Sequence, residues 1–63
     1  MITYEIGLQF LWKPINQFDK TEVVTVVDLR RGGKAKLSNG WVVDAYGGAE
    51  GTKMMPGGHV EPM

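Results

Sequence analysis

Residues 21–46 read TEVVTVVDLRRGGKAKLSNGWVVDAY, and this stretch predicts three consecutive antiparallel strands. Residues 21–29 are dense in β-branched side chains, which are enriched in strands. Two glycine-containing dipeptides, Gly32-Gly33 and Asn39-Gly40, interrupt the apolar pattern, and Asn-Gly is a strong hairpin signal. We therefore expect strands at residues 21–29, 34–38 and 41–46, joined by two tight turns.

The turn after Arg30 decides which residues of the first hairpin face each other. A three-residue loop at residues 31–33, with a glycine in the left-handed conformation, places Asp28 opposite Lys36. Opposite charges at facing positions stabilise a strand pair. A two-residue Gly32-Gly33 loop would shift the register by one and place Asp28 beside Leu37 among apolar neighbours. We therefore favour the three-residue loop.

This register, followed by a two-residue Asn39-Gly40 turn, gives the three strands two distinct faces. We expect the apolar face to contain Val27, Leu29, Ala35, Leu37 and Val42. We expect the opposite face to contain Arg30, Lys34, Lys36, Trp41 and Val43. Together with Arg31 in the turn, the second face gathers four of the seven cationic residues of the chain.

The segments before and after residues 21–46 have different sequence patterns from those three strands. Apolar residues alternate with other residues over residues 2–10, which predicts another half-buried strand. Pro14 cannot donate a ladder hydrogen bond, so we expect a loop over residues 14–20. After Tyr46 the chain is rich in glycine; residues 53–55 suggest a fifth short strand, and residues 56–63 a flexible tail.

Four or five short strands linked by glycine-rich turns predict an all-β fold. We expect one domain over residues 1–55, a small SH3-like barrel or rolled antiparallel sheet, with a flexible C-terminus at residues 56–63. Closure of the sheet removes its exposed edges, which otherwise promote aggregation. Pairing of two copies into a homodimer is the other way to cover an edge.

The composition argues against several functional classes. Seven basic and seven acidic residues give a formal net charge of zero, unlike the basic excess usual in nucleic-acid-binding domains. The chain has no cysteine and a single histidine, His59, in the expected tail, so we expect neither a metal site nor a fixed catalytic base. We therefore expect no cofactor and no enzymatic activity. We also expect no membrane span, because no apolar run approaches about 20 residues.

The strongest candidate binding surface is the basic cluster. It consists of Arg30, Arg31, Lys34 and Lys36, with Trp41 on the same face. Such a patch can bind a protein partner, and it can also follow a phosphate backbone while a base stacks on the ring. A charged hairpin tip that only keeps the chain in solution is the alternative. Trp12, beside a loop, is either an exposed interface anchor or a cap on one end of the barrel.

Two segments carry a resemblance to known proteins: KTEVVTVV at residues 20–27 and KLSNGWVV at residues 36–43. They resemble the hairpins of small SH3-like barrels, including the KOW type, and also short stand-alone proteins of bacteriophages. The phage resemblance implies an accessory protein in the cytoplasm of a bacterial host. It would bind and inhibit a host protein complex, such as a defence nuclease complex or the transcription machinery. The barrel resemblance implies the alternative of a nucleic-acid-binding module, and a self-assembling structural subunit is a third hypothesis.

Overall fold

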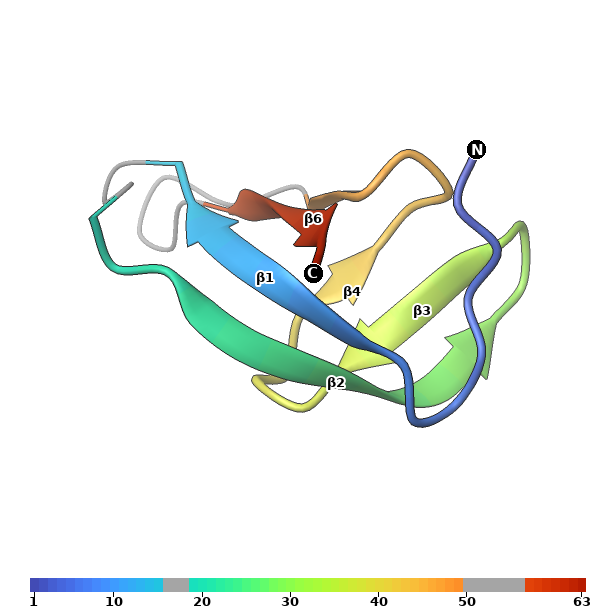
Figure 1. Ribbon diagram of the computed structural model, residues 1–63. Coiled ribbons are helices and arrows are strands. Elements are labelled where there is room, and N and C mark those ends of the chain that lie inside the picture. The colour runs from blue at the N-terminus through green and yellow to red at the C-terminus, as the bar shows by residue number, and fades with distance from the viewer. Residues whose placement is uncertain (16–18, 50–56) are drawn as a thin grey trace.

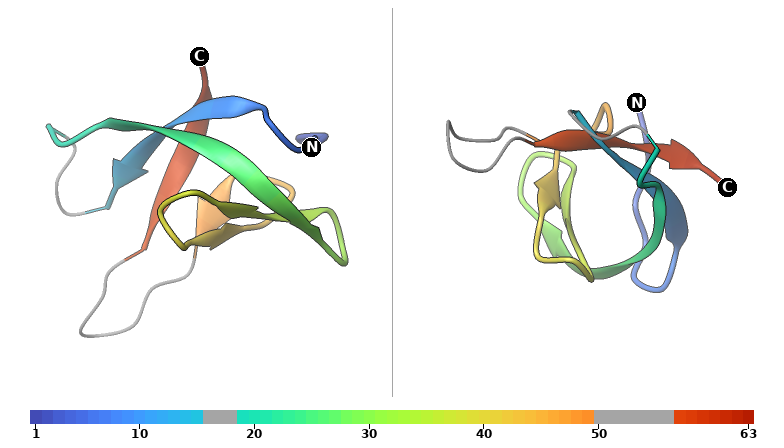
Figure 2. Two further views of the ribbon diagram at one scale, coloured as in Figure 1. Left: turned by 90° about the horizontal axis from the view of Figure 1, so that it is seen from below. Right: turned by 90° about the vertical axis from the view of Figure 1, so that its left-hand side faces the viewer.

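The computed structural model describes residues 1–15, 19–49 and 57–63, and these residues form six antiparallel strands (Figure 1). The strands are β1 (Gln9–Pro14), β2 (Glu22–Arg30), β3 (Lys34–Leu37), β4 (Val42–Val43), β5 (Gly48–Ala49) and β6 (Gly58–Pro62). They form one sheet in the order β4-β3-β2-β1-β6-β5. The sheet curls into a nearly closed barrel, seen from two sides in Figure 2. The predicted all-β fold and small barrel are confirmed.

Strand β2 takes part in both halves of the barrel. Its first half pairs with β1, with Thr25 opposite Gln9, and its second half pairs with β3. A β-bulge between Val26 and Asp28 marks the change of partner, and a bulge bends a strand and increases its twist. At this corner the amide of Val26 donates to the carbonyl of Leu8 at 2.8 Å, which ties β2 to the N-terminal segment.

The predicted register of the first hairpin is confirmed. Asp28 faces Lys36, and the residue pairs that follow lead to a three-residue turn. Gly32 and Gly33 both have positive φ angles, 78° and 77°, as the left-handed turn requires. The placement of Val27 in the core is wrong, because the bulge adds one residue to β2. Val26 is buried instead, and Val27 is 48% exposed.

The second turn is longer by one residue than predicted. The amide of Leu37 donates to the carbonyl of Trp41 at 2.8 Å, so residues 38–40 form a three-residue loop. Gly40 has a φ of 93°, but Asn39 does not have the positive φ that a two-residue type I′ turn needs. As a result Ala35 faces Val43, and Lys36 faces Val42. Val43 therefore lies in the core and Val42 on the outer surface, which is the reverse of the prediction.

The first strand begins later than predicted. Residues 1–8 form no strand, because a turn with a hydrogen bond from the amide of Leu8 to the carbonyl of Glu5 interrupts the extended chain. Gly7 in this turn has a φ of 95°, and Ile6 is 66% exposed. The alternation instead continues through Phe10 and Trp12, both buried. The predicted loop at residues 14–20 starts too early, because Pro14 still belongs to β1.

The predicted C-terminal tail is wrong, because β6 lies in the sheet between β1 and β5. Val60 of this strand is 5% exposed and packs in the core. The backbone at Gly58 lies so close to β1 that there is no space for a side chain, and this, rather than a need for a flexible chain, accounts for the glycine. A Cβ atom at Gly58 would lie 2.5 Å from the carbonyl oxygen of Lys13 and 3.0 Å from the ring of Trp12. The fifth strand predicted at residues 53–55 lies outside the described residues.

The core fills the inside of the barrel with side chains from five of the strands and the N-terminal segment. Its buried members are Tyr4, Phe10, Trp12, Val24, Val26, Ala35, Leu37, Val43 and Val60, with Ile2, Trp41 and Ala49 packed against them. Two aromatic pairs hold it together: Tyr4 meets Phe10 edge to face, and Trp12 stacks on Trp41 with ring centroids 5.7 Å apart. Offset stacking of this kind stabilises beyond the area it buries.

The close approach at Gly58 predicts the effect of a single methyl group. Gly58→Ala should lower the free energy of unfolding by about 3 kcal/mol, the upper part of the usual range for overpacking, because backbone of β1 must move. Gly32→Ala is the matched control: its Cβ meets open space, so only the left-handed conformation costs about 1–2 kcal/mol. Urea unfolding measures both. Equal destabilisation of the two variants would contradict the packing described here.

Candidate functional site

The predicted cations gather on the outer surface of the β2–β3 hairpin. Arg30 faces Lys34 across the hairpin, and Lys36 lies between Asp28 and Val42 in the next row of the sheet. Arg31 follows in the turn and is exposed. We call this surface the hairpin patch: Asp28, Arg30, Arg31, Lys34, Lys36, Val42 and Asp44. The structure thus brings the four predicted cationic residues together.

Two carboxylates offset part of this positive charge. The guanidinium Nε of Arg30 lies 3.3 Å from Oδ2 of Asp28. The pKa of Asp44 is lowered mainly by hydrogen bonds from the amides of Gly48 and Tyr46, and the charge of Lys34 contributes a smaller part. Within the described residues, Arg31 and Lys36 have no such partner. The patch is therefore mixed in sign, and Arg31 at its tip is an exposed cation that pairs with no carboxylate of the described residues.

The two tryptophans do not belong to this patch. Trp41 lies opposite Leu37 on the core side of the sheet, because the longer turn moves it to the other face from the one predicted. It is half-buried and stacks on Trp12. Trp12 is 3% exposed and belongs to the core cluster, so of the two hypotheses for this residue the exposed interface anchor is wrong.

Apolar side chains lie beside the cations instead of the expected tryptophan. Val42 is exposed next to Lys36, on the outer side of the hairpin. Leu29 points to the inner side, opposite Ala35, but the barrel opens at this end and leaves Leu29 47% exposed. Sequence reasoning placed both residues in the core. One feature of the sequence indicated that some of these side chains would be exposed: residues 21–46 contain more apolar side chains than one face of a sheet can bury.

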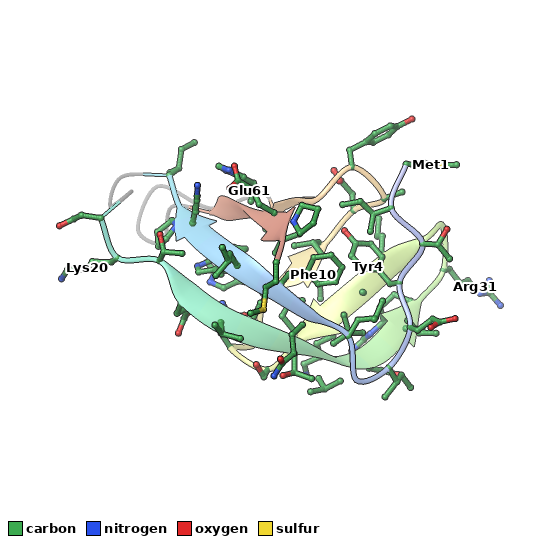
Figure 3. All side chains as sticks on the ribbon, viewed as in Figure 1. Met1, Tyr4, Phe10, Lys20, Arg31 and Glu61 are labelled. Atoms are coloured by element: carbon green, nitrogen blue, oxygen red, sulfur yellow. The ribbon has the colours of Figure 1, made fainter. Side chains whose placement is uncertain are left out.

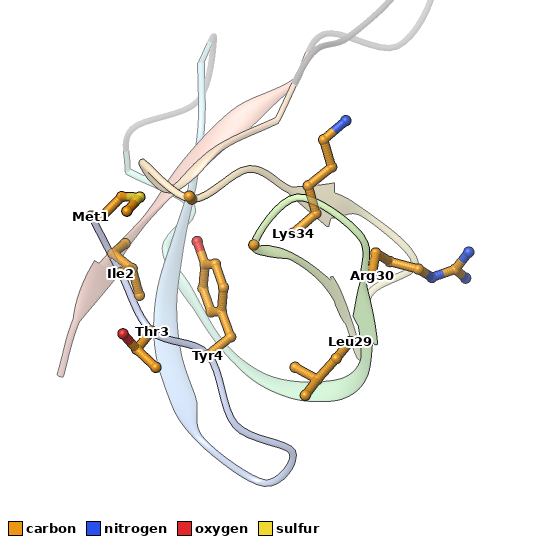
Figure 4. A pocket seen from close by; sticks show the side chains of 9 residues that line it. Met1, Ile2, Thr3, Tyr4, Leu29, Arg30 and Lys34 are labelled. Atoms are coloured by element: carbon orange, nitrogen blue, oxygen red, sulfur yellow. The ribbon is translucent and has the colours of Figure 1, made fainter.

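A pocket of about 280 Å³ opens at this end of the barrel, between the N-terminal segment and the β2–β3 hairpin (Figure 4). Its lining is Met1, Ile2, Thr3, Tyr4, Leu29, Arg30, Gly33, Lys34 and Ala45. Tyr4 and Leu29 turn toward the space, whereas the heads of Arg30 and Lys34 extend away from it (Figure 4). The pocket is thus apolar inside and bordered by cationic stems. Nothing in the sequence pattern pointed to it, since Tyr4 was expected in a strand.

Tyr4 is anchored at the bottom of this pocket. Its hydroxyl donates a hydrogen bond of 2.6 Å to the backbone carbonyl of Asp44. Burial raises the pKa of Tyr4 above its ordinary value, and the negative charge of Asp44 raises it further. The phenol therefore stays neutral and fixed in place. Its hydrogen-bonding capacity as a donor is already used, so the ring offers the pocket mainly an apolar surface.

A second, more polar hollow of about 300 Å³ lies on the outer surface and is lined by Lys34, Val42, Asp44 and Gly48. Asp44 shapes it by closing the turn between β4 and β5. Its Oδ1 accepts the amides of Tyr46 at 2.8 Å and Gly48 at 3.1 Å. The hydrogen bond from Gly48, followed by the one from Tyr46, lowers the pKa of Asp44 below its ordinary value. Lys34 thus borders both hollows, one apolar and one polar.

The side chains of His59 and Ser38, which could in principle take part in catalysis, form structural contacts within the sheet. His59 lies in β6, where its Nε2 is 3.5 Å from Oε1 of Glu61. The ammonium of Lys13 is 2.6 Å from Oε2 of the same carboxylate, and this hydrogen bond lowers the pKa of Glu61. Ser38 accepts the amide of Thr25 at 3.0 Å and helps to fix the corner of β2. Among the described residues, no group of three His, Cys, Asp or Glu residues could hold a metal ion.

No protein-family model, no curated protein and no solved structure matches this chain. The described residues contain no helix that is long and apolar enough to cross a membrane.

The lowered pKa of Asp44 predicts how the turn responds to acid. A carboxylate with a lowered pKa stabilises the fold above its unfolded value, here 3.8, and this contribution is lost as the pH falls through the lowered folded value. Asp44→Asn should therefore be less stable than the wild type at neutral pH, and the gap should shrink below pH 3.8. Thermal unfolding at a series of pH values measures it. A gap that stays constant with pH would contradict the assignment.

Proposed function

We propose that this protein is not an enzyme and acts by binding another protein through the hairpin patch. The observation that carries the proposal is the mixture of side chains around Lys34. Two cations without an ion-pair partner among the described residues, Arg31 and Lys36, lie with two carboxylates near exposed apolar side chains and two hollows. Protein interfaces combine apolar surface with arginine and a polar rim in this way.

The charge distribution favours a protein over a nucleic acid as the partner. A phosphate backbone needs several cations whose charge is not offset, because the release of counterions drives binding. Here Asp28 pairs with Arg30, Asp44 lies near Lys34, and the net charge of the chain is zero. None of the seven described residues of the hairpin patch has an aromatic ring that could stack a base, since Trp41 packs against the core.

The resemblance to short bacteriophage proteins extends this proposal to a class of partner. We propose that the chain binds a bacterial host complex, such as a defence nuclease complex or the transcription machinery, and inhibits it by covering a surface that the complex needs. The small size of the barrel suits such a role, because binding requires an exposed surface rather than an enclosed catalytic site. Self-assembly through strand edges is a weaker alternative, since the edge strands β4 and β5 each have only two residues.

A capture experiment with two charge-reversal variants tests the proposal. Arg31 and Lys20 lie at opposite ends of the molecule (Figure 3), and both are exposed. Tagged wild type, Arg31→Glu and Lys20→Glu are each incubated with untreated and with nuclease-treated bacterial lysate, and bound proteins are quantified by mass spectrometry. We expect one stoichiometric protein complex with the wild type and Lys20→Glu, and about tenfold less with Arg31→Glu, which loses a charge and gains a repulsion.

Two results would overturn the proposal. Capture that disappears after nuclease treatment would point to the nucleic-acid-binding alternative, with binding that weakens steeply as salt rises. Equal loss of capture in both variants would show that the hairpin patch is not the contact surface. Circular dichroism of each variant checks that the barrel is folded before capture is compared.

A further inference from the structure

We propose that the pocket at the open end of the barrel takes one apolar side chain from an acidic peptide segment of the partner. The inference rests on the proposed function and specifies the chemistry of the contact. The partner segment would insert a leucine-like or aromatic side chain between Tyr4 and Leu29. Its flanking carboxylates would meet the cations on the rim, first of all Arg31.

The size of the pocket selects a single side chain. At about 280 Å³ it lies just below the range of about 300–1,000 Å³ in which small-molecule and cofactor sites are found. A cavity of about 150 Å³ already accommodates a benzene ring. One apolar side chain with part of its backbone therefore fits in the pocket.

The chemistry inside the pocket selects an apolar group. Ile2, Leu29 and Ala45 contribute aliphatic surface, and the ring of Tyr4 lies between them and Phe10. The hydroxyl of Tyr4 is committed to the carbonyl of Asp44, and no buried side-chain polar atom of the described residues lacks a hydrogen-bond partner. The interior therefore offers no unsatisfied polar group to a ligand, and filling it with apolar atoms removes apolar surface from water.

The charges around the mouth select an acidic segment. Arg30 and Lys34 follow the border of the pocket, and their heads point outward (Figure 4), while Arg31 lies in the turn that joins their strands. Arg30 is already paired with Asp28, whereas Arg31 has no ion-pair partner among the described residues. Arg31 lies in the turn between Arg30 and Gly33, which both line the pocket, so a carboxylate of a peptide that leaves over this turn can form a charge-assisted hydrogen bond with it. A basic segment would be repelled at the same place.

Selection from a library of random linear peptides tests this inference with a defined probe. The immobilised full chain is used as bait, and the enriched peptides are sequenced. We expect them to share one large apolar residue next to acidic residues. One enriched peptide is then synthesised, labelled and titrated by fluorescence anisotropy against the wild type and the variants below.

Two positions on β2 provide a matched pair for the titration. Leu29 and Val23 are 47% and 51% exposed, but only Leu29 lines the pocket. Leu29→Asp should weaken peptide binding about tenfold or more, as for loss of a hot spot, and Val23→Asp should leave it unchanged. Ala45→Leu is a second, independent variant, since it fills the pocket with apolar atoms and should also weaken binding without adding a charge.

The results separate this inference from the proposed function. Failure to enrich any peptide, enrichment of basic peptides, or equal binding by Leu29→Asp and Val23→Asp would overturn the pocket assignment. If the protein complex captured from lysate is still bound by Leu29→Asp but lost with Arg31→Glu, the proposed function stands and the pocket inference falls. If capture is insensitive to both variants, both fall.

Discussion

The structure depends on one constraint, which is that β2 must pair with β1 and with β3 although these two strands lie in different halves of the barrel. The exchange of partners takes place at Val26, where the strand bulges and its amide bonds to Leu8. Thr25 and Ser38 exchange two further hydrogen bonds beside it, of 2.8 and 3.0 Å. A sheet that bends here can close, and closure brings β6 next to β1 and leaves only the two-residue strands β4 and β5 at its edges. Short edges are a common protection against aggregation.

The sequence predicted the structure correctly where charge and turn geometry together favoured a single arrangement of the chain. The register that places Asp28 opposite Lys36 was predictable from their opposite charges and from two glycines able to adopt positive φ, although the carboxylate of Asp28 forms its ion pair with Arg30. Three errors had a common origin, namely single residues that change the register or direction of the chain: the bulge at Val27, the extra residue of the second turn, and the turn at Gly7. The C-terminal strand was missed for another reason. A glycine that allows two strands to approach closely looks the same in a sequence as a glycine in a flexible tail.

These small shifts decide what the surface can bind. A change of one residue in the second turn sends Trp41 inward to stack on Trp12 and sends Val42 outward beside Lys36. A patch predicted to combine cations with an aromatic ring is in fact a patch of offset charges and aliphatic side chains. The four cations were predictable because charged residues stay exposed in either register. The pocket lined by Tyr4 was not predictable, because it depends on the path of residues 1–8. The proposed preference for a protein partner follows from this difference.

The central claim is that the described residues form one barrel, closed by the last strand and bent at Val26. Amide hydrogen exchange measured by NMR tests it most directly. Three amides should be protected to a similar, near-global level: Val26, which donates to Leu8, Leu37, which donates to Trp41, and Val60, which donates to Gly47 at 2.8 Å. Exchange of the Val60 amide at the rate of an unstructured chain, while Val26 and Leu37 stay protected, would contradict the account.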